Sequence, residues 1–184
     1  MSGFLSVEHA HWPVYRVVRR AWEDPLDASY SRSRPDNRWN TAEFPALYCC
    51  CHPRVARAVT LDVFRLAGVE LADLQPAALP QLVEVSWNGR VVDVASAEGV
   101  IAAGFPSEYP KGVGKSQTRR YATEWYAKGA KGVVCRSASI ARTGFSSWSG
   151  PHISWGELTI FVSNAKRRPR LLHRRRDLDW FTKS

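Results

Sequence analysis

The sequence predicts an α+β fold. Short apolar stretches typical of strands occur along most of the chain, and helical stretches lie between them without a regular strand–helix alternation. At 184 residues, of which 45% are hydrophobic, the chain is long enough to bury a core without disulfides or a metal. We therefore expect a single domain over residues 1–184.

The first half of the chain predicts two strands and a helix. The stretch "WPVYRVVR" (residues 12–19) alternates around β-branched residues and indicates a strand, and a polar loop follows over residues 24–40. The continuous apolar run "FPALYCCC" (residues 44–51) indicates a buried strand. His52-Pro53 then begins a helix that Gly68 ends. We expect its apolar stripe to contain Val55, Val59, Val63 and Leu66.

The second half predicts further strands and two helices. Asn88-Gly89 inside "LVEVSWNGRVVDV" (residues 82–94) is a strong signal for a β-hairpin. Helices are expected over residues 97–103 and 116–128, the second one ended by Gly129, and strands over "KGVVCR" (131–136) and "ELTIFVS" (157–163). Between these strands, residues 137–156 form a long polar and aromatic loop, which suggests a lid over a ligand.

The composition favours an anionic partner. The chain carries 26 Lys and Arg against 17 Asp and Glu, a formal net charge of +9. Seven of the eleven residues from Lys166 to Arg176 are Lys or Arg, within a basic C-terminal segment over residues 166–184. This segment fits either a solvated strand edge and tail or a docking surface, and nucleic acid is a secondary expectation for the partner.

Cysteine usage and hydropathy indicate a cytoplasmic protein. Cys49, Cys50 and Cys51 are adjacent and only Cys135 is distant, so neither a disulfide framework nor a zinc site is expected and the thiols are interpreted as reduced packing residues. The opening residues lack the pattern of a secretory signal, and no stretch approaches the length of a membrane span. The oligomeric state stays open.

Strand-borne polar residues indicate a ligand with phosphates and ribose. Arg16 and Arg38 offer guanidinium groups suited to phosphate oxygens, while Tyr48 and Ser137 offer hydroxyls suited to sugars. Trp39 beside Arg38 is a further candidate contact, with a simple cation–π pair as the alternative. Each of the others also has a plain structural interpretation, such as a solvent-facing arginine, a core tyrosine or a turn serine.

The order of these motifs resembles the RES domain, a family named for its Arg, Glu and Ser. The resemblance covers about residues 13–165 and is carried by "YRVV" (15–18), "RWN" (38–40), "PALY" (45–48), "GKSQTRRYATEWYAKG" (114–129) and "KGVVCRSA" (131–138). It implies a split, mixed β-sheet like that of ADP-ribosyltransferases, binding of NAD+, and toxins that degrade NAD+ beside an antitoxin. It also implies Arg16 and Arg38 on the NAD+ phosphates, with Tyr48 and Ser137 in the same cleft.

One position departs from the family pattern. Where the family usually has a glutamate on the helix after the "LY" strand, this chain has Val59. Such a carboxylate stabilises the oxocarbenium character that builds on the ribose as the nicotinamide bond breaks. Asp62, one turn further along the helix, is a candidate surrogate, and Glu124 is a weaker one that fits an exposed helix face better.

Two functions from different classes follow from this resemblance. The first is an enzyme that cleaves the nicotinamide–ribose bond of NAD+ with water or phosphate, or that transfers ADP-ribose. In it Ser137, Tyr48 and Asp62 are the candidate catalytic residues, and the partner is an antitoxin of helix-turn-helix type. The second is a binding module that keeps the nucleotide cleft but has lost efficient cleavage. A nucleic-acid-binding protein that uses the basic segment is a third hypothesis.

Overall fold

The computed structural model describes residues 4–9, 13–34, 37–142 and 155–175. Within them, the strands are β1 (Ser6–His9), β2 (Pro13–Arg19), β3 (Ala46–Cys50), β4 (Pro80–Ser86), β5 (Gly89–Val94), β6 (Gly132–Cys135), β7 (Glu157–Phe161) and β8 (Arg170–Arg175). The helices are α1 (Pro53–Ala67), α2 (Ala97–Ala102), α3 (Lys115–Ala127) and α4 (Ala138–Arg142), with short 3-10 turns η1 (Ser29–Ser33), η2 (Leu71–Asp73) and η3 (Pro76–Ala78).

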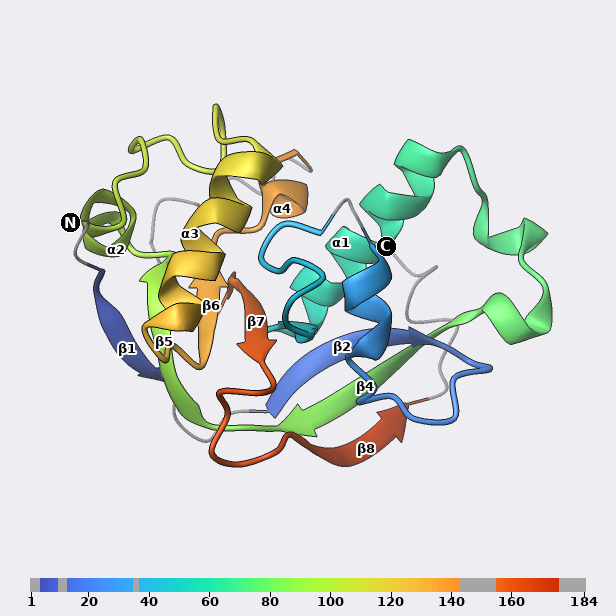
Figure 1. The fold of residues 1–184 in the computed structure, drawn as a ribbon. Helices are drawn as coiled ribbons and strands as arrows, with labels where there is room; N and C mark the ends of the chain where they lie inside the picture. Colours follow the sequence, from blue (N-terminus) through green and yellow to red (C-terminus); the bar gives the residue numbers. More distant parts are fainter. Residues whose placement is uncertain (1–3, 10–12, 35–36, 143–154, 176–184) are drawn as a thin grey trace.

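The described strands form one mixed sheet in the order β1-β5-β6-β7-β3-β2-β4-β8. β5 and β6 run parallel, and the other neighbours are antiparallel. Only the pair Tyr15↔Cys50 joins β2 to β3, so the sheet divides there into two halves. In Figure 1, β5, β6 and β7 lie on one side beneath α3, and β2, β4 and β8 lie on the other. The predicted α+β class is confirmed.

Helix α1 follows the predicted local signals. His52 caps its N-terminus, because the backbone N–H of Arg54 donates to His52 Nδ1 at 3.1 Å. Pro53 occupies the first turn, and Gly68 ends the helix in the left-handed conformation with φ of 64°. The predicted apolar stripe is wrong beyond its first turns, because Val63 and Leu66 are exposed and the buried face continues to Asp62 instead.

The predicted hairpin at Asn88-Gly89 is also wrong. β4 pairs with β2 and β8, whereas β5 pairs with β1 and β6, so the two strands pass into different halves of the sheet (Figure 1). Gly89 serves packing rather than a turn, since a Cβ there would lie 2.7 Å from the Trp87 ring. The sequence signal was correct for two strands and a short link, but the link does not reverse the chain.

The other predicted elements are confirmed within one or two residues, and, apart from the short 3-10 turns, three elements were missed. α3 ends at the predicted place, with Gly129 at φ of 82°. The missed elements are β1, α4 and β8; α4 lies in the stretch predicted as a loop, and β8 lies in the basic segment. The remainder of that predicted loop, residues 143–154, lies outside the described residues.

Three apolar clusters support the two faces of the sheet. Trp39, Phe44 and Trp125 belong to a large aromatic cluster beneath α2 and α3. A second cluster fills the opposite face, with residues from both halves of the sheet such as Val83 and Leu158. A third, including Val55 and Ile140, packs α1 and α4 against the sheet. Strand residues alternate between these clusters, so the face of each polar side chain follows from its register.

Among the described residues, no helix combines the length and apolar character that crossing a bilayer requires.

Candidate functional site

The Arg38–Asn40 segment is fixed to the end of the sheet by a buried tyrosine. The Tyr48 hydroxyl donates to Asn40 Oδ1 at 2.8 Å and accepts from the backbone N–H of Trp39 at 2.9 Å. Asn40 in turn donates to the carbonyl of Ser31 at 3.0 Å. Both functions of the Tyr48 hydroxyl are therefore used within the protein. Burial raises the pKa of Tyr48, so this phenol stays protonated and acts as a positioning group rather than as a base.

Trp39 is a core residue, which corrects its predicted role as a ligand contact. Its side chain is 1% exposed, its indole N–H donates to Cys135 Sγ at 3.2 Å, and its ring stacks on Trp125 with centroids 5.8 Å apart. It does not stack on Arg38. The apolar neighbours that surround the ring outweigh the polar character of the "RWN" motif, and the buried indole anchors the segment on which Arg38 sits.

The side chain of Arg38 is half-buried, on the face of the sheet that carries the ring of Tyr48. Its Nη1 atom is buried without a hydrogen-bond partner. Burial lowers the pKa of Arg38, but Tyr109, Cys135 and Glu157 more than offset this, so its pKa is raised overall. The buried hydroxyl of Tyr109 lies beside this guanidinium and is the first of the groups that raise the pKa of Arg38. A guanidinium with an unsatisfied buried N–H is suited to an anionic group.

Glu157 is a carboxylate at this site that the sequence reasoning missed. It begins β7 opposite Cys50 of β3 and Cys135 of β6, and Tyr48 is its diagonal neighbour on the same face, since Tyr48 pairs with Thr159. Its charge raises the pKa of Tyr48 and of Tyr109, after the larger effect of burial on each. The sequence did contain a signal for this carboxylate, because Glu157 directly follows a long loop and begins an apolar strand.

The structure does not bring Arg16 and Arg38 together. Arg16 lies on the same face of β2 as Val14 and Val18, which is opposite to the face of the Tyr48 ring, and it is 8% exposed. Its guanidinium donates to the carbonyls of Tyr48 at 3.2 Å and Asp27 at 3.3 Å. Arg38 lies on the face of the Tyr48 ring, so the predicted convergence of the two arginines on one diphosphate is wrong for this geometry. The guanidinium of Arg16 instead ties the residue 24–30 loop to β3.

Ser137 and Asp62 are each bonded to residues of α4, but not to each other in any hydrogen bond of the described residues. Ser137 is fully buried, and its Oγ accepts from the backbone N–H of Ile140 at 3.4 Å. Ser139 Oγ donates to Asp62 Oδ2 at 2.9 Å, while Asp62 Oδ1 lies 2.9 Å from Arg65 Nη2. Both carboxylate oxygens of Asp62 therefore already hold partners, and its geometry favours a tether between the helices over the predicted catalytic role.

Val59 lies on the buried side of α1. It is half-buried and packs beside the third apolar cluster, which includes Cys50 and Ile140. Glu124, the weaker candidate, lies on the outer side of α3, where its Oε1 is 3.8 Å from Lys128 Nζ and its side chain is 47% exposed. The interpretation of Glu124 as a surface residue is therefore confirmed.

The cysteines are free and buried, as predicted. Burial raises the pKa of Cys49 and of Cys135 to about 12 each. A thiol with so high a pKa carries almost no thiolate at neutral pH, so these cysteines are packing groups rather than nucleophiles.

The fold and this site define a class: an α+β domain with an arginine, two phenols and a carboxylate on one face of a divided mixed sheet. The RES domain family model matches residues 13–147 of the chain, which is well over half of it. The chain belongs to the RES domain family. The predicted resemblance is confirmed, although the match ends before the predicted residue 165.

A solved structure supports the same fold. The chain is similar to one in the crystal structure of the M. tuberculosis MbcT–MbcA toxin–antitoxin complex, with a TM-score of 0.71 and 17% identity over 92% of this chain and 85% of that one. At this identity the likeness concerns the fold. No curated protein matches the chain.

Proposed function

We propose that this protein consumes NAD+ by cleaving its nicotinamide–ribose bond, as a toxin-like enzyme of the RES family. The observation that carries the proposal is Arg38, a guanidinium with a buried, partnerless N–H on the same sheet face as the Glu157 carboxylate. Membership of the RES family supports NAD+ as the substrate, because the motif order of this chain resembles NAD+-degrading members.

In the proposed reaction, the bond between ribose C1′ and the nicotinamide nitrogen breaks, and its electron pair leaves with neutral nicotinamide. Water or hydrogen phosphate then forms the new C–O bond at this same carbon, which is C1″ in the numbering of ADP-ribose, giving ADP-ribose or its 1″-phosphate, and the proton of the attacking water or hydrogen phosphate passes to solvent. Transfer of ADP-ribose to a macromolecule differs only in the acceptor. Positive charge on the ribose is greatest at the transition state, where a nearby carboxylate lowers the barrier.

The residues divide into binding, stabilising and positioning roles. Arg38 holds the diphosphate, and Glu157 stabilises the oxocarbenium in place of the family glutamate. Tyr48 positions Arg38 through its hydrogen bonds to the Trp39 N–H and Asn40. A cleft role for Ser137 stays a prediction, because its buried hydroxyl accepts from the Ile140 N–H.

A second candidate is an NAD+-binding module with weak or no cleavage. Val59 favours it, because an aliphatic side chain occupies the position of the family glutamate beside an apolar cluster. Such a module would act through a partner. For either function, we propose a single-domain protein in the cytoplasm. Its proposed partner is an antitoxin of helix-turn-helix type. Co-purification with the product of a neighbouring gene tests this partner.

The test is nicotinamide release from NAD+ by the purified protein, with and without phosphate, together with NAD+ binding by calorimetry. Arg38→Ala should weaken NAD+ binding, and Glu157→Gln should lower release by about a hundredfold or more while binding is retained. Glu124→Gln, which removes an exposed carboxylate from α3, is the matched control and should leave release unchanged.

The outcomes separate the candidates. Binding without release by the unaltered protein supports the module. Release that is equally insensitive to Glu157→Gln and Glu124→Gln removes Glu157 from the mechanism. Neither binding nor release, in a protein that unfolds cooperatively, overturns both candidates.

A further inference from the structure

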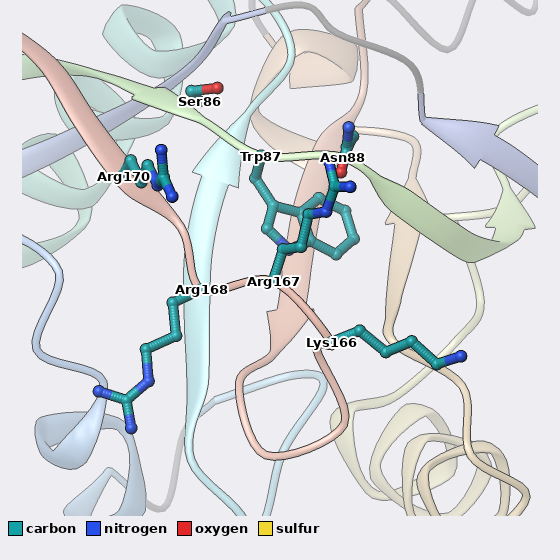
Figure 2. Close-up of a pocket in the computed structure, with 7 residues that line it drawn as sticks. All are labelled: Ser86, Trp87, Asn88, Lys166, Arg167, Arg168 and Arg170. Atoms are coloured by element: carbon teal, nitrogen blue, oxygen red, sulfur yellow. The ribbon is translucent and has the colours of Figure 1, made fainter.

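A basic pocket lies away from the Arg38 site, at the link between the two halves of the sheet. It has a volume of about 440 Å³ and is lined by Ser86, Trp87, Asn88, Lys166, Arg167, Arg168 and Arg170 (Figure 2). One wall is the β4–β5 link, and the other is the segment that leads into β8. Arg170 begins β8 directly opposite Ser86 of β4, so the sheet itself fixes the two walls relative to each other.

Packing makes the floor of this pocket firm. Trp87 is 4% exposed and belongs to the second apolar cluster, which draws residues from both halves of the sheet. Gly89 leaves room for the Trp87 ring, since any Cβ at that position would lie 2.7 Å from it. The cationic side chains that line the pocket above Trp87 are exposed; they are Lys166, Arg167, Arg168 and Arg170. The concave shape therefore rests on buried structure, while its charges stay free to meet a ligand.

The walls of the pocket carry several positive charges and no negative charge that would balance them. Of the described residues that line it, four are Lys or Arg and none is acidic. Figure 2 shows Lys166 and Arg168 extending to opposite sides of the segment, while Arg167 crosses over Trp87 toward Asn88. Cations spread in this way suit a row of negative charges better than a single phosphate. Their mutual repulsion is relieved when such a row binds.

We propose that this pocket binds the sugar-phosphate backbone of a nucleic acid. Three of its four cations are arginines, whose planar guanidinium groups match phosphate oxygens. Ser86 and Asn88 add hydrogen-bonding side chains of the kind that contact the backbone. With Trp87 buried, the pocket offers no exposed ring of its own for stacking on bases, so binding is expected to be independent of sequence.

The surface fits an acidic protein segment less well. Protein interfaces centre on exposed aromatic or apolar anchors, whereas the lining here is mostly polar and basic. Addition of a partner strand to β8 is also disfavoured, because the β4–β8 ladder is irregular between Glu84 and Val85 and cationic side chains discourage edge pairing. This site is separate from the proposed NAD+ site, so either proposal can fail without the other.

The test measures binding of a fluorescein-labelled DNA duplex by anisotropy over a range of salt concentrations. Arg167→Gln/Arg168→Gln should weaken binding at least tenfold at low salt and reduce the slope of log K against log salt by about two, since each phosphate contact contributes about 0.9. The matched control, Lys111→Gln/Arg120→Gln, removes two exposed cations from the loop before α3 and from α3. It should change both quantities far less.

Each outcome of this experiment either supports or overturns the proposed binding of nucleic acid. Selective loss in the pocket variant, with unchanged nicotinamide release and thermal unfolding, supports the proposal. Equal loss in the control variant means that only the net charge matters and overturns it. Absence of DNA binding at low salt, or binding of poly-glutamate in preference to DNA, also overturns it, the second result pointing to an acidic protein partner.

Discussion

Arg16 and Arg38 lie on opposite faces of the sheet, separated by the strand that carries Tyr48. Arg16 donates to the Tyr48 carbonyl from one side, while the Tyr48 hydroxyl fixes the segment of Arg38 on the other. Two arginines that appear as a pair in the motif order therefore have different roles. The guanidinium of Arg16 is bonded within the protein, whereas that of Arg38 has a buried N–H without a hydrogen-bond partner.

Replacing Arg16 should mainly affect stability. Arg16→Ala removes the two hydrogen bonds that the buried guanidinium donates to the carbonyls of Tyr48 and Asp27. The free energy of unfolding, measured by urea titration, should therefore fall by about 2 to 3 kcal/mol. Arg19→Ala, on the exposed end of the same strand, is the control and should cost less than about 0.5 kcal/mol. A large rise in KM for NAD+ without loss of stability would return Arg16 to the ligand site.

Removing one hydroxyl tests the positioning role of Tyr48. Tyr48→Phe leaves the Trp39 N–H and Asn40 without their partner, which should cost about 1 to 3 kcal/mol of stability. Because Arg38 is then less well placed, KM for NAD+ should rise while the pH profile of kcat keeps its shape. A change in that profile would instead show that the phenol takes part in proton transfer.

The surrogate role predicted for Asp62 has a simple test. Asp62→Asn removes the charge but keeps an oxygen that can accept from Ser139, and the Arg65 partner is largely exposed, so the cost should be about 1 kcal/mol or less. Nicotinamide release should stay within about twofold of the unaltered protein. A loss above tenfold in a normally folded variant would contradict the structural role and make Asp62 catalytic.

Restoring a glutamate on α1 tests whether the family geometry persists. Val59→Glu places a carboxylate on the half-buried side of the helix, where it should raise nicotinamide release about tenfold or more, at a cost of about 1 to 3 kcal/mol of stability. Val63→Glu, one turn further along at a site that is 56% exposed, is the control and should change neither nicotinamide release nor stability. Equal rates for the two well-folded variants would show that the site no longer uses that position.

The cap of α1 should make stability depend on pH. Burial and then the charge of Arg54 lower the pKa of His52 below its ordinary value of 6.5. The unfolded chain therefore takes up the proton first, and stability should fall as the pH drops through 6.5. Protonation also removes the Nδ1 acceptor of the Arg54 N–H. Tm measured from pH 8 to 5.5 should fall less for His52→Asn than for the unaltered protein, and parallel curves would exclude His52 as the cause.

Most elements were predictable because their signals are local. The cap and glycine stop of α1, the apolar run of β3 and the end of α3 at Gly129 each depend on a few adjacent residues. The family could also be recognised, since motif order is a property of the chain itself. Short elements such as β1 and α4 lack a periodic signal of sufficient length and were missed.

The sequence by itself determined the elements, the family and the positive charge of this protein. Only the tertiary structure decided that β4 and β5 part instead of pairing, that Arg16 and Arg38 occupy different faces, and that Glu157 joins Arg38 and Tyr48. The reason is that strand side chains alternate with a period of two, so pairing and register assign each side chain to a face. Register is set by contacts between distant segments, which no local pattern contains.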